Sequence, residues 1–402
     1  MNTQMNIDTP YALSDELKNL VAAEWPRFSD AEMEQRHTAI DALMAEAEIK
    51  YLLVYGFFWN GPAVPWLTHW PTSAEAALVV TPGEEKSLYV QFHNHVPQAS
   101  IGATHCTVDW GGPDTMATVI ADLQNRGAGA DDRIGVIGPL SMAGVSRLKA
   151  AFGDVVDLNR SYGALRLVKS PEEVDWMRIG GWYSDRAIQA VADNLAPGIT
   201  ERELGDLCQR AWVPYGGETV IHFFGSTPMA DPNCKVPRQL PSVRPIETGD
   251  IVFCEISAAF RGYSGQVLRS FTVGADPTAL YRDLHATAEA AFDAICGVLK
   301  AGVTAEEIVA ASSVIEETGF TTCDDLVHGY GGGYLPPIVG SASRPAGPIP
   351  DMTLTAGMMI VVQPNVVSQD GKAGVQTGEC VLITEDGWES IHRFPGGLRR
   401  AG

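Results

Sequence analysis

One short segment, residues 166–173, constrains the fold of this chain more than any other. Ser170 has a side chain that can cap a helix, Pro171 suits the first helical position, and the two glutamates that follow favour the positive end of a helix. The segment therefore predicts the start of a helix and a domain junction. We expect one domain in residues 1–165 and a second in residues 166–402.

Length and charge limit the class of protein. The chain has 402 residues, enough for two or three domains, and a formal net charge of −21. Its basic residues are scattered, whereas a nucleic-acid-binding protein needs a cationic face to displace counterions. Apolar residues make up 45% and charged residues 19% of the chain, which is typical of a globular protein. We expect a small-molecule partner and no nucleic acid.

The cysteines and the N-terminus favour a cytoplasmic protein. Seven cysteines occur without a C-x-x-C pair, which is typical of reduced thiols. Residues 1–13 are polar and lack the apolar core of a secretory signal. No run approaches the ~18 uninterrupted apolar residues of a membrane span, so we expect none.

The two parts of the chain differ in how helices and strands follow one another. In residues 1–165 the two patterns alternate, beginning with a helix from Asp30 and a strand at residues 51–55, which predicts an α/β domain. In the second part, two helices precede a strand pair at residues 251–258 and 266–273, which predicts an α+β domain. The other expected elements are a hairpin of residues 76–80 and 87–91, helices near 114–124, 141–151, 277–299 and 304–318, and strands at 133–137, 358–362 and 379–384.

A series of motifs follows in order along the second part. They are Leu165–Glu173, Gly249–Glu255, Gly262–Phe271, His328–Gly333, Gly357–Pro364, Gly374–Gly387 and Phe394–Gly397. In this order they resemble the catalytic domain of the family that includes creatinase, prolidase and methionine aminopeptidase. The resemblance implies a pita-bread α+β domain, preceded by a creatinase-type α/β domain, in a homodimer.

The resemblance also implies five positions that bind two metal ions in the metallopeptidase members, namely two aspartates, one histidine and two glutamates. In this chain these positions fall, in order, on Glu255, Gln266, His328, Gln363 and Gly378, with Glu379 beside the last. A glutamine amide is uncharged and a glycine has no side chain, whereas two neighbouring divalent cations need carboxylates to offset their repulsion. We therefore expect no metal cofactor. A mononuclear site of Glu255, His328 and Glu379 is the alternative that we favour less.

The polar replacements point to another chemistry rather than to a decayed site. Creatinase is a metal-free member of the family, and it attacks a cationic guanidinium carbon with acid–base groups. A carboxylate at the position of Glu255 resembles the ectoine-hydrolysing members, which implies hydrolysis of ectoine, or a similar zwitterionic cyclic amidine, to N-acetyl-2,4-diaminobutyrate. Glu255 is expected to act as the nucleophile or as the base that activates water, and His328 to protonate the departing ring nitrogen. Gln266 and Gln363 would orient the amidine N–H groups, and Glu379 would bind an amidine nitrogen or act as a second base.

Three further residues are candidates for substrate binding. His222 falls in a segment that lines the site in family members, but a packed or surface histidine explains it equally well. Tyr334 follows the histidine motif and could close the pocket, although we favour an aromatic packed in the core. Trp59 belongs to an aromatic loop of the first domain, which could cap an amidinium in the partner subunit by a cation–π contact. A hydrophobic domain or dimer contact is the alternative for this loop.

Three other functions compete with the amidine hydrolase. A metal-dependent Xaa-Pro peptidase on the same fold predicts a bound transition metal and inactivation by a chelator. A creatinase-like amidinohydrolase predicts a creatine-like substrate. A non-catalytic peptidase homologue predicts ligand binding without turnover.

Overall fold

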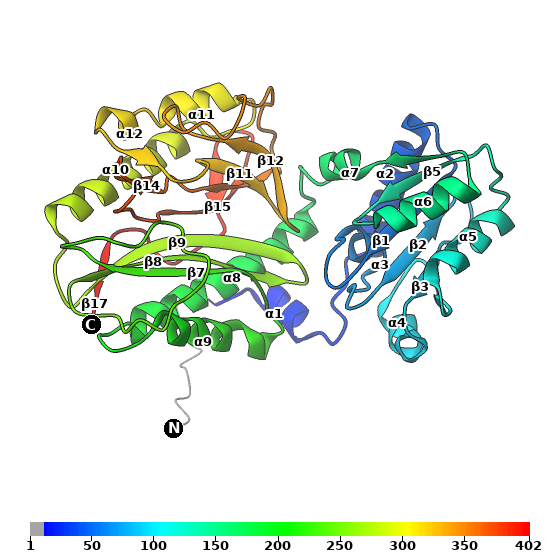
Figure 1. Ribbon diagram of the computed structural model, residues 1–402, viewed down its shortest axis with the longest axis horizontal. Coiled ribbons are helices and arrows are strands. Elements are labelled where there is room, and N and C mark those ends of the chain that lie inside the picture. Colours follow the sequence, from blue (N-terminus) through cyan, green and yellow to red (C-terminus); the bar gives the residue numbers. More distant parts are fainter. Residues whose placement is uncertain (1–11) are drawn as a thin grey trace. The chain divides into compact units, whose positions relative to one another are not determined.

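The computed structural model describes residues 12–402, which form two compact units (Figure 1). One unit comprises residues 24–166, and the other contains residues 167–402 together with residues 12–23. The division differs from the sequence prediction at the N-terminus, because α1 (Asp15–Ala22) packs on α8 (Pro171–Asn194) of the larger unit. Residues 1–13, in which we expected no secretory signal, lie largely outside the described part of the chain.

The unit of residues 24–166 is built on a six-stranded sheet that helices cover on both faces. Its strands are β1 (Tyr51–Gly56), β2 (Ala76–Val80), β3 (Ser87–Val90), β4 (Thr107–Trp110), β5 (Arg133–Ile137) and β6 (Asp154–Asp157), in the order β4-β3-β2-β1-β5-β6. Its helices are α2 (Asp30–Glu46), α3 (Ala63–Thr68), α4 (Val96–Gly102), α5 (Thr115–Asn125), α6 (Met142–Ala151) and α7 (Asn159–Leu165), with a 3-10 turn at His93–His95. Leu52 and Val54 of β1 pack with residues of α2 and α3, whereas Leu53 and Tyr55 pack with residues of α5 and α6. A central strand that is apolar throughout is therefore buried on both faces, as the α/β prediction requires.

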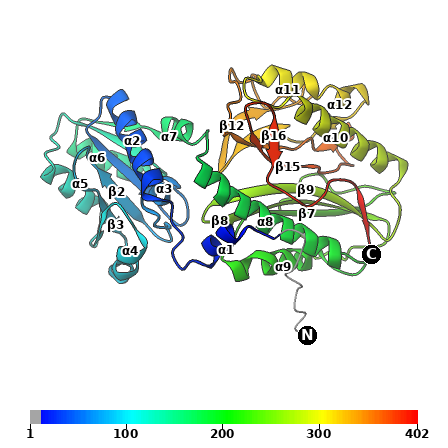
Figure 2. The ribbon, with the colours of Figure 1, turned by 180° about the vertical axis from the view of Figure 1, so that it is seen from behind.

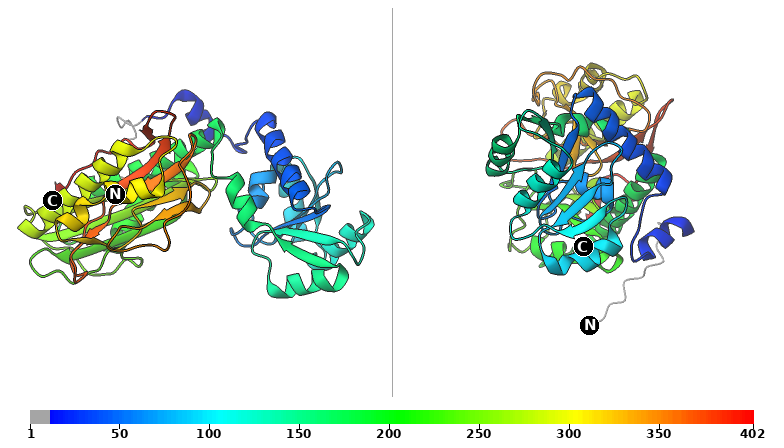
Figure 3. Two further views of the ribbon diagram at one scale, coloured as in Figure 1. Left: turned by 90° about the horizontal axis from the view of Figure 1, so that it is seen from above. Right: turned by 90° about the vertical axis from the view of Figure 1, so that its right-hand side faces the viewer.

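The larger unit is built on a nine-stranded sheet between two groups of helices. The sheet has the order β12-β11-β13-β15-β9-β8-β7, with β16 added beside β15 and β17 beside β9. Figures 1 and 2 show α8 and α9 along β7–β9, and α10, α11 and α12 on the other side, over β11–β15. The three long strands β7–β9 run through the whole unit and are green to yellow-green in Figure 3.

The elements of this unit have the following bounds. The strands are β7 (Glu218–Pro228), β8 (Asp250–Phe260), β9 (Tyr263–Val273), β11 (Val327–Tyr330), β12 (Tyr334–Val339), β13 (Met359–Val362), β15 (Gly378–Ile383), β16 (Trp388–Ser390) and β17 (Arg399–Ala401), and β10 (Thr321–Thr322) pairs separately with β14 (Val366–Val367). The helices are α9 (Glu201–Trp212), α10 (Ala279–Val298), α11 (Ala305–Ala311) and α12 (Val314–Glu317), with a 3-10 turn at Val213–Tyr215.

The strand pair β8–β9 confirms the expected hairpin and fixes the register of the site. Ile251 pairs with Thr272 at one end and Phe260 with Tyr263 at the other. The two residues of the connecting turn, Arg261 and Gly262, have positive φ angles of 51° and 83°. Two-residue hairpins favour such turns because their twist matches that of the strands.

The helix predictions are confirmed with one exception. Ser170 accepts a hydrogen bond from the backbone of Glu173, whose side chain bonds back to Ser170, so α8 begins with a complete capping box. The single helix expected over residues 304–318 is wrong, because α11 and α12 are separated at Ser312, whose hydroxyl donates to the carbonyl of Val309. Of the helices in residues 12–402, not one is long and apolar enough to cross a membrane.

Candidate active site

Three glutamine side chains, on or next to different strands of the larger unit, gather around the carboxylate of Glu255. Glu255 lies on β8, and Gln266 of the neighbouring β9 donates from Nε2 to its Oε1 at 3.0 Å. The same Nε2 donates to Oε1 of Gln363, which directly follows β13, at 3.0 Å. Gln376, two residues before β15, donates from Nε2 to Glu255 Oε2 at 2.6 Å. The structure thus brings together Glu255, Gln266 and Gln363, as expected, and adds Gln376.

The carboxylate of Glu255 lies in an unusual electrostatic environment. It is 4% exposed, and burial, together with the nearby charge of Asp324, raises its pKa to about 7, although the hydrogen bond from Gln376 opposes this shift. Both hydrogen-bond donors to the carboxylate are neutral amides. Glu255 therefore exchanges a proton near neutral pH, which suits a general base that later acts as an acid.

His328, on β11, points to the same face of the sheet as this cluster. It pairs with Val361 of β13, and Gln363 follows two residues later in the chain, where the alternation of a strand returns to the same face. Its Nδ1 donates to the carbonyl of Gly329 at 3.1 Å, and burial lowers its pKa to about 4. His328 is therefore neutral at neutral pH, with Nε2 as a hydrogen-bond acceptor, which differs from the proton-donor role expected from the sequence.

Tyr334 packs directly on this histidine. Its ring stacks on that of His328 with a centroid distance of 3.9 Å and an interplanar angle of 19°. Its hydroxyl donates to both carboxylate oxygens of Asp325 at 2.8 Å. Burial raises the pKa of Asp325 above its usual range, and the adjacent Asp324 adds to this shift. Tyr334 is 49% exposed, so it covers one side of His328 and is not a packed core aromatic.

The cluster presents several buried acceptors that lack partners. Gln266 Oε1, Gln376 Oε1 and His328 Nε2 have no hydrogen-bond partner among residues 12–402. Buried polar atoms are almost always paired, so orphaned acceptors in a site call for donors from a ligand or water. Together with the carboxylate of Glu255, these atoms are acceptors for N–H or O–H groups from a bound molecule or water.

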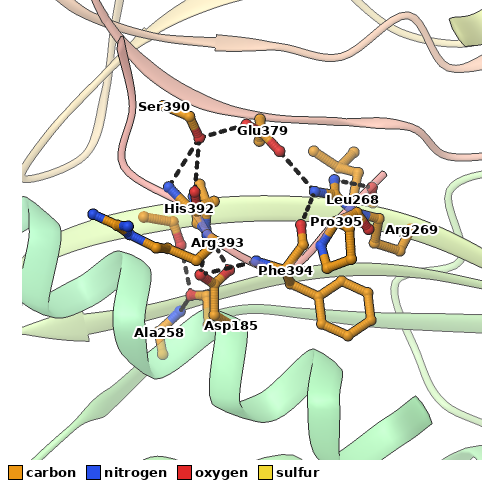
Figure 4. Close-up of polar contacts among 12 residues, drawn as sticks. Asp185, Ala258, Leu268, Arg269, Glu379, Ser390, His392, Arg393, Phe394 and Pro395 are labelled. Carbon is orange, nitrogen blue, oxygen red and sulfur yellow. Dashed lines mark hydrogen bonds and ion pairs between the residues drawn. The ribbon is translucent and has the colours of Figure 1, made fainter. Parts of the chain in front are cut away.

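Glu379 does not belong to this cluster. Gly378 and Glu255 both pair with Leu268, which places Gly378 on the face of Glu255 and the adjacent Glu379 on the opposite face. The carboxylate of Glu379 accepts hydrogen bonds from Arg269 at 2.6 Å and from the hydroxyl of Ser390 (Figure 4). Burial alone would raise its pKa, but the charge of Arg269 holds the pKa below its usual range. Glu379 is therefore occupied by an ion pair, away from the position where a second base was expected.

The network around Glu379 fixes the C-terminal segment. Arg269 also donates to the carbonyls of Phe394 and Pro395, and Asp185 of α8 binds Nδ1 of His392 at 2.9 Å. Figure 4 shows these groups linked through Ser390, whose hydroxyl contacts both Glu379 and the backbone of His392.

Two further candidates lie elsewhere. His222 pairs with Ile256, the neighbour of Glu255, so its side chain is on the opposite face of β7 and β8. There it packs between the rings of Trp212 and Phe224, at centroid distances of 5.6 and 4.8 Å. Trp59 belongs to the other unit, where it is 67% exposed in a turn.

The residues of this chain do not fit the two-metal centre that the family resemblance implies. At the five ligand positions the carboxylates are reduced to Glu255, and the two glutamines are hydrogen-bonded to it or to each other. A Cβ at Gly378 would lie 2.0 Å from the carbonyl oxygen of Val362, so the backbone leaves no room for a side chain there. Within residues 12–402, no group of three or more His, Cys, Asp or Glu side chains is arranged to hold a metal ion.

Comparison with known proteins identifies the family. The model of metallopeptidase family M24 matches residues 175–385, more than half of the chain. The chain therefore belongs to family M24, the creatinase and prolidase family, and its larger unit has the pita-bread fold that the motifs implied. A probable dipeptidase PepE of Mycobacterium bovis is 32% identical over 238 residues, which are 58% of this chain and 60% of that protein. The chain thus spans about three fifths of the length of this relative.

Other relatives extend the similarity to both units. A Xaa-Pro dipeptidase of Lactobacillus helveticus is 26% identical over 258 residues, covering 63% of this chain and 68% of that protein. The structure of a Xaa-Pro dipeptidase from Bacillus anthracis superimposes with a TM-score of 0.78 and 20% identity, over 92% of this chain and 99% of that one. A prolidase from Pyrococcus furiosus gives a TM-score of 0.74 and 21% identity, over 88% and 98%. The two-domain fold is therefore shared with these peptidases.

Proposed function

We propose that this protein is a metal-independent hydrolase that opens the ring of a cyclic amidine, with ectoine as the substrate. The observation that supports this most is the set of buried acceptors around Glu255: the carboxylate, Gln266 Oε1, Gln376 Oε1 and His328 Nε2. A protonated cyclic amidine offers two N–H donors and a delocalised positive charge. A neutral peptide bond offers one N–H and no charge.

The chemistry follows from the position and proton affinity of Glu255. In one case its carboxylate attacks the carbon between the two amidine nitrogens, the bond from that carbon to the ring nitrogen breaks as the nitrogen takes a proton from water, and the hydroxide formed cleaves the adduct and frees Glu255. In the second case the carboxylate removes a proton from the water that attacks the same carbon. The same carboxyl group then carries that proton to the departing ring nitrogen, and a pKa near 7 suits both steps. Water and the amidinium then yield an amide and an ammonium group, so the overall charge is conserved. Gln266 orients the carboxylate, and neutral His328 accepts an N–H of the substrate at Nε2.

Two of the family's carboxylate ligand positions are occupied here by the amides of Gln266 and Gln363. This argues against the peptidase reaction that the names of the relatives suggest. Removing carboxylates from a two-metal site removes the charge that holds the ions together. The retained glutamines instead form a hydrogen-bonded chain through Glu255 and Gln363. A site of this kind favours an organic cation over a pair of divalent ions.

The test is a direct assay with and without chelator. Purified protein is incubated with ectoine in the presence or absence of EDTA, and N-acetyl-2,4-diaminobutyrate is measured by mass spectrometry. We expect the same rate in both conditions and, in Glu255→Gln, a loss of at least about 10³-fold, because the reacting carboxylate is absent.

The alternatives give different results in the same assay. Hydrolysis of a Xaa-Pro dipeptide that needs added Mn²⁺ and stops with EDTA would replace the proposal with a metallopeptidase. Binding of ectoine without product, measured by calorimetry, would identify a non-catalytic homologue. Turnover of creatine in preference to ectoine would identify a creatinase-like enzyme.

A further inference from the structure

Gln376 is held in place more firmly than a loop residue usually is. It lies two residues before β15, and its backbone is tied to β9 by the hydroxyl of Ser270. That hydroxyl accepts from the N–H of Gln376 at 3.0 Å and donates to its carbonyl at 3.0 Å. The side chain is fully buried. The position of its amide is therefore set by the sheet.

The amide of Gln376 completes the hydrogen bonding of the reacting carboxylate. Glu255 Oε1 accepts from Gln266 at 3.0 Å, and Oε2 accepts from Gln376 at 2.6 Å. Each carboxylate oxygen thus has one donor, and the two donors come from different strands. With only one of them, the carboxyl group could rotate about its last side-chain bond, whereas two donors fix its plane.

The choice of a neutral donor matters for a cationic substrate. A lysine or arginine at this place would orient the carboxylate equally well, but its charge would cancel the attraction for an amidinium. The titratable groups whose charges interact with Glu255 are Asp324, Cys323, Tyr330 and Tyr334, and neutral His328 shares its face of the sheet. A cationic side chain in place of Gln376 would therefore add a positive charge beside Glu255 and weaken the attraction of the site for a cationic substrate.

We propose that Gln376 is the positioning residue of Glu255, which fixes the plane of the reacting carboxylate through its Nε2 donor without adding charge. This inference rests on the proposed function for its effect on rate. Its effect on the carboxylate itself can be measured without any substrate.

The experiment compares Gln376→Met, which keeps the length but has no N–H donor, with Gln376→Glu, which keeps the shape but adds a charge. The titration of Glu255 is followed by ¹³C NMR of protein labelled at the glutamate carboxyl carbon, and Glu255→Gln assigns the signal. We expect the midpoint to rise by about one to two pH units in Gln376→Met, the change that follows the loss of one charge-assisted hydrogen bond, and further in Gln376→Glu. With ectoine, kcat should fall about 10- to 100-fold, KM should change little, and the acidic limb of kcat/KM should move to higher pH with the midpoint.

A matched control is Gln369→Met, at an exposed position where the side chain contacts the carbonyls of Gly319 and Phe320. It should leave the titration of Glu255 unchanged. A folded Gln376→Met with an unchanged midpoint would overturn the proposal, and if that variant does not fold, Gln376→Ala, which also lacks the N–H donor and adds no charge, decides in the same way. A shifted midpoint in a protein that does not hydrolyse ectoine would support the positioning role and refute the proposed function instead.

Discussion

Arg269 holds Glu379 at 2.6 Å on the face of the sheet opposite to Glu255. The guanidinium is 4% exposed and also donates to the carbonyls of Gly378 and Phe394. The arginine is therefore buried and its partner Glu379 is mostly covered, with 14% of its side chain exposed, and the arginine satisfies backbone groups of the C-terminal segment as well.

This pair makes a prediction about stability. Arg269→Met leaves the mostly covered Glu379 without its counter-charge and several backbone carbonyls without their donor, and we expect a loss of about 2–4 kcal/mol in the free energy of unfolding. Glu379→Gln removes the buried charge but keeps a hydrogen-bond acceptor, so its loss should be smaller. Urea denaturation of both variants measures the difference. Equal losses would mean that the arginine acts only through this one carboxylate.

Gly378 provides a second prediction. Its φ angle is +146°, and a Cβ would approach Val362 O to 2.0 Å and Gln363 Cα to 2.9 Å. Gly378→Ala should therefore reduce the free energy of unfolding by about 2–4 kcal/mol, because strands β13 and β15 would have to separate. The control is Gly297→Ala in α10, where a Cβ meets no atom within 4 Å. It should be stabilising by about 0.5–1 kcal/mol, and a neutral Gly378→Ala would contradict the tight approach.

The raised pKa of Glu255 predicts how its removal affects stability. The folded-state pKa of about 7 lies above the ordinary glutamate value of 4.5, so the contribution of this group to stability is present below about pH 4.5 and is lost as the pH rises through 7. Glu255→Gln should accordingly be more stable than wild type at pH 8, by about 1–3 kcal/mol, and the gain should shrink at pH 5. Denaturation at the two pH values tests this. The exposed Glu385→Gln should show no such pH-dependent difference.

A buried histidine in the smaller unit gives a prediction of the opposite sign. His37 is 8% exposed, and burial, with help from the charge of Lys86, lowers its pKa to about 3. Its folded-state pKa lies below the ordinary value, so stability is present above about pH 6.5 and is lost as the pH falls. Between pH 7 and pH 5 we expect this residue alone to remove about 1–2 kcal/mol, measured as faster hydrogen exchange in α2. His37→Met should weaken this dependence, and an identical dependence in the variant would show that other groups cause it.

The sequence was sufficient for the elements and for most of the cluster, for identifiable reasons. Glu255, Gln266 and His328 lie on strands of one sheet, and Gln363 directly follows another of its strands, so the motifs that mark these strands also mark residues of one sheet. Gln376 was not recognised, although it lies two residues before Gly378 and the period of a strand places both on one face. The two-residue alternation of the strand was thus the feature of the sequence from which Gln376 could have been predicted.

The same rule explains where Glu379 and His222 lie. Glu379 was considered beside Gly378 as a replacement ligand, but adjacent residues of a strand point to opposite faces. The location of His222 depended on the register between β7 and β8, which includes a bulge between Thr219 and Ile221. A shift of one residue reverses the face, and no local pattern reports it. The hydrogen bond from Tyr334 to Asp325 could not be predicted from the alternation of a strand. It depends on how the two side chains pack in the folded unit.

The close approach of β13 and β15 at Gly378 limits how the site can be redesigned. Any side chain introduced there would require the main chain of the two strands to move apart first, so replacing this residue by glutamate would not by itself place a carboxylate beside Glu255. A redesign would have to change the backbone of the strand pair as well as the side chains on it.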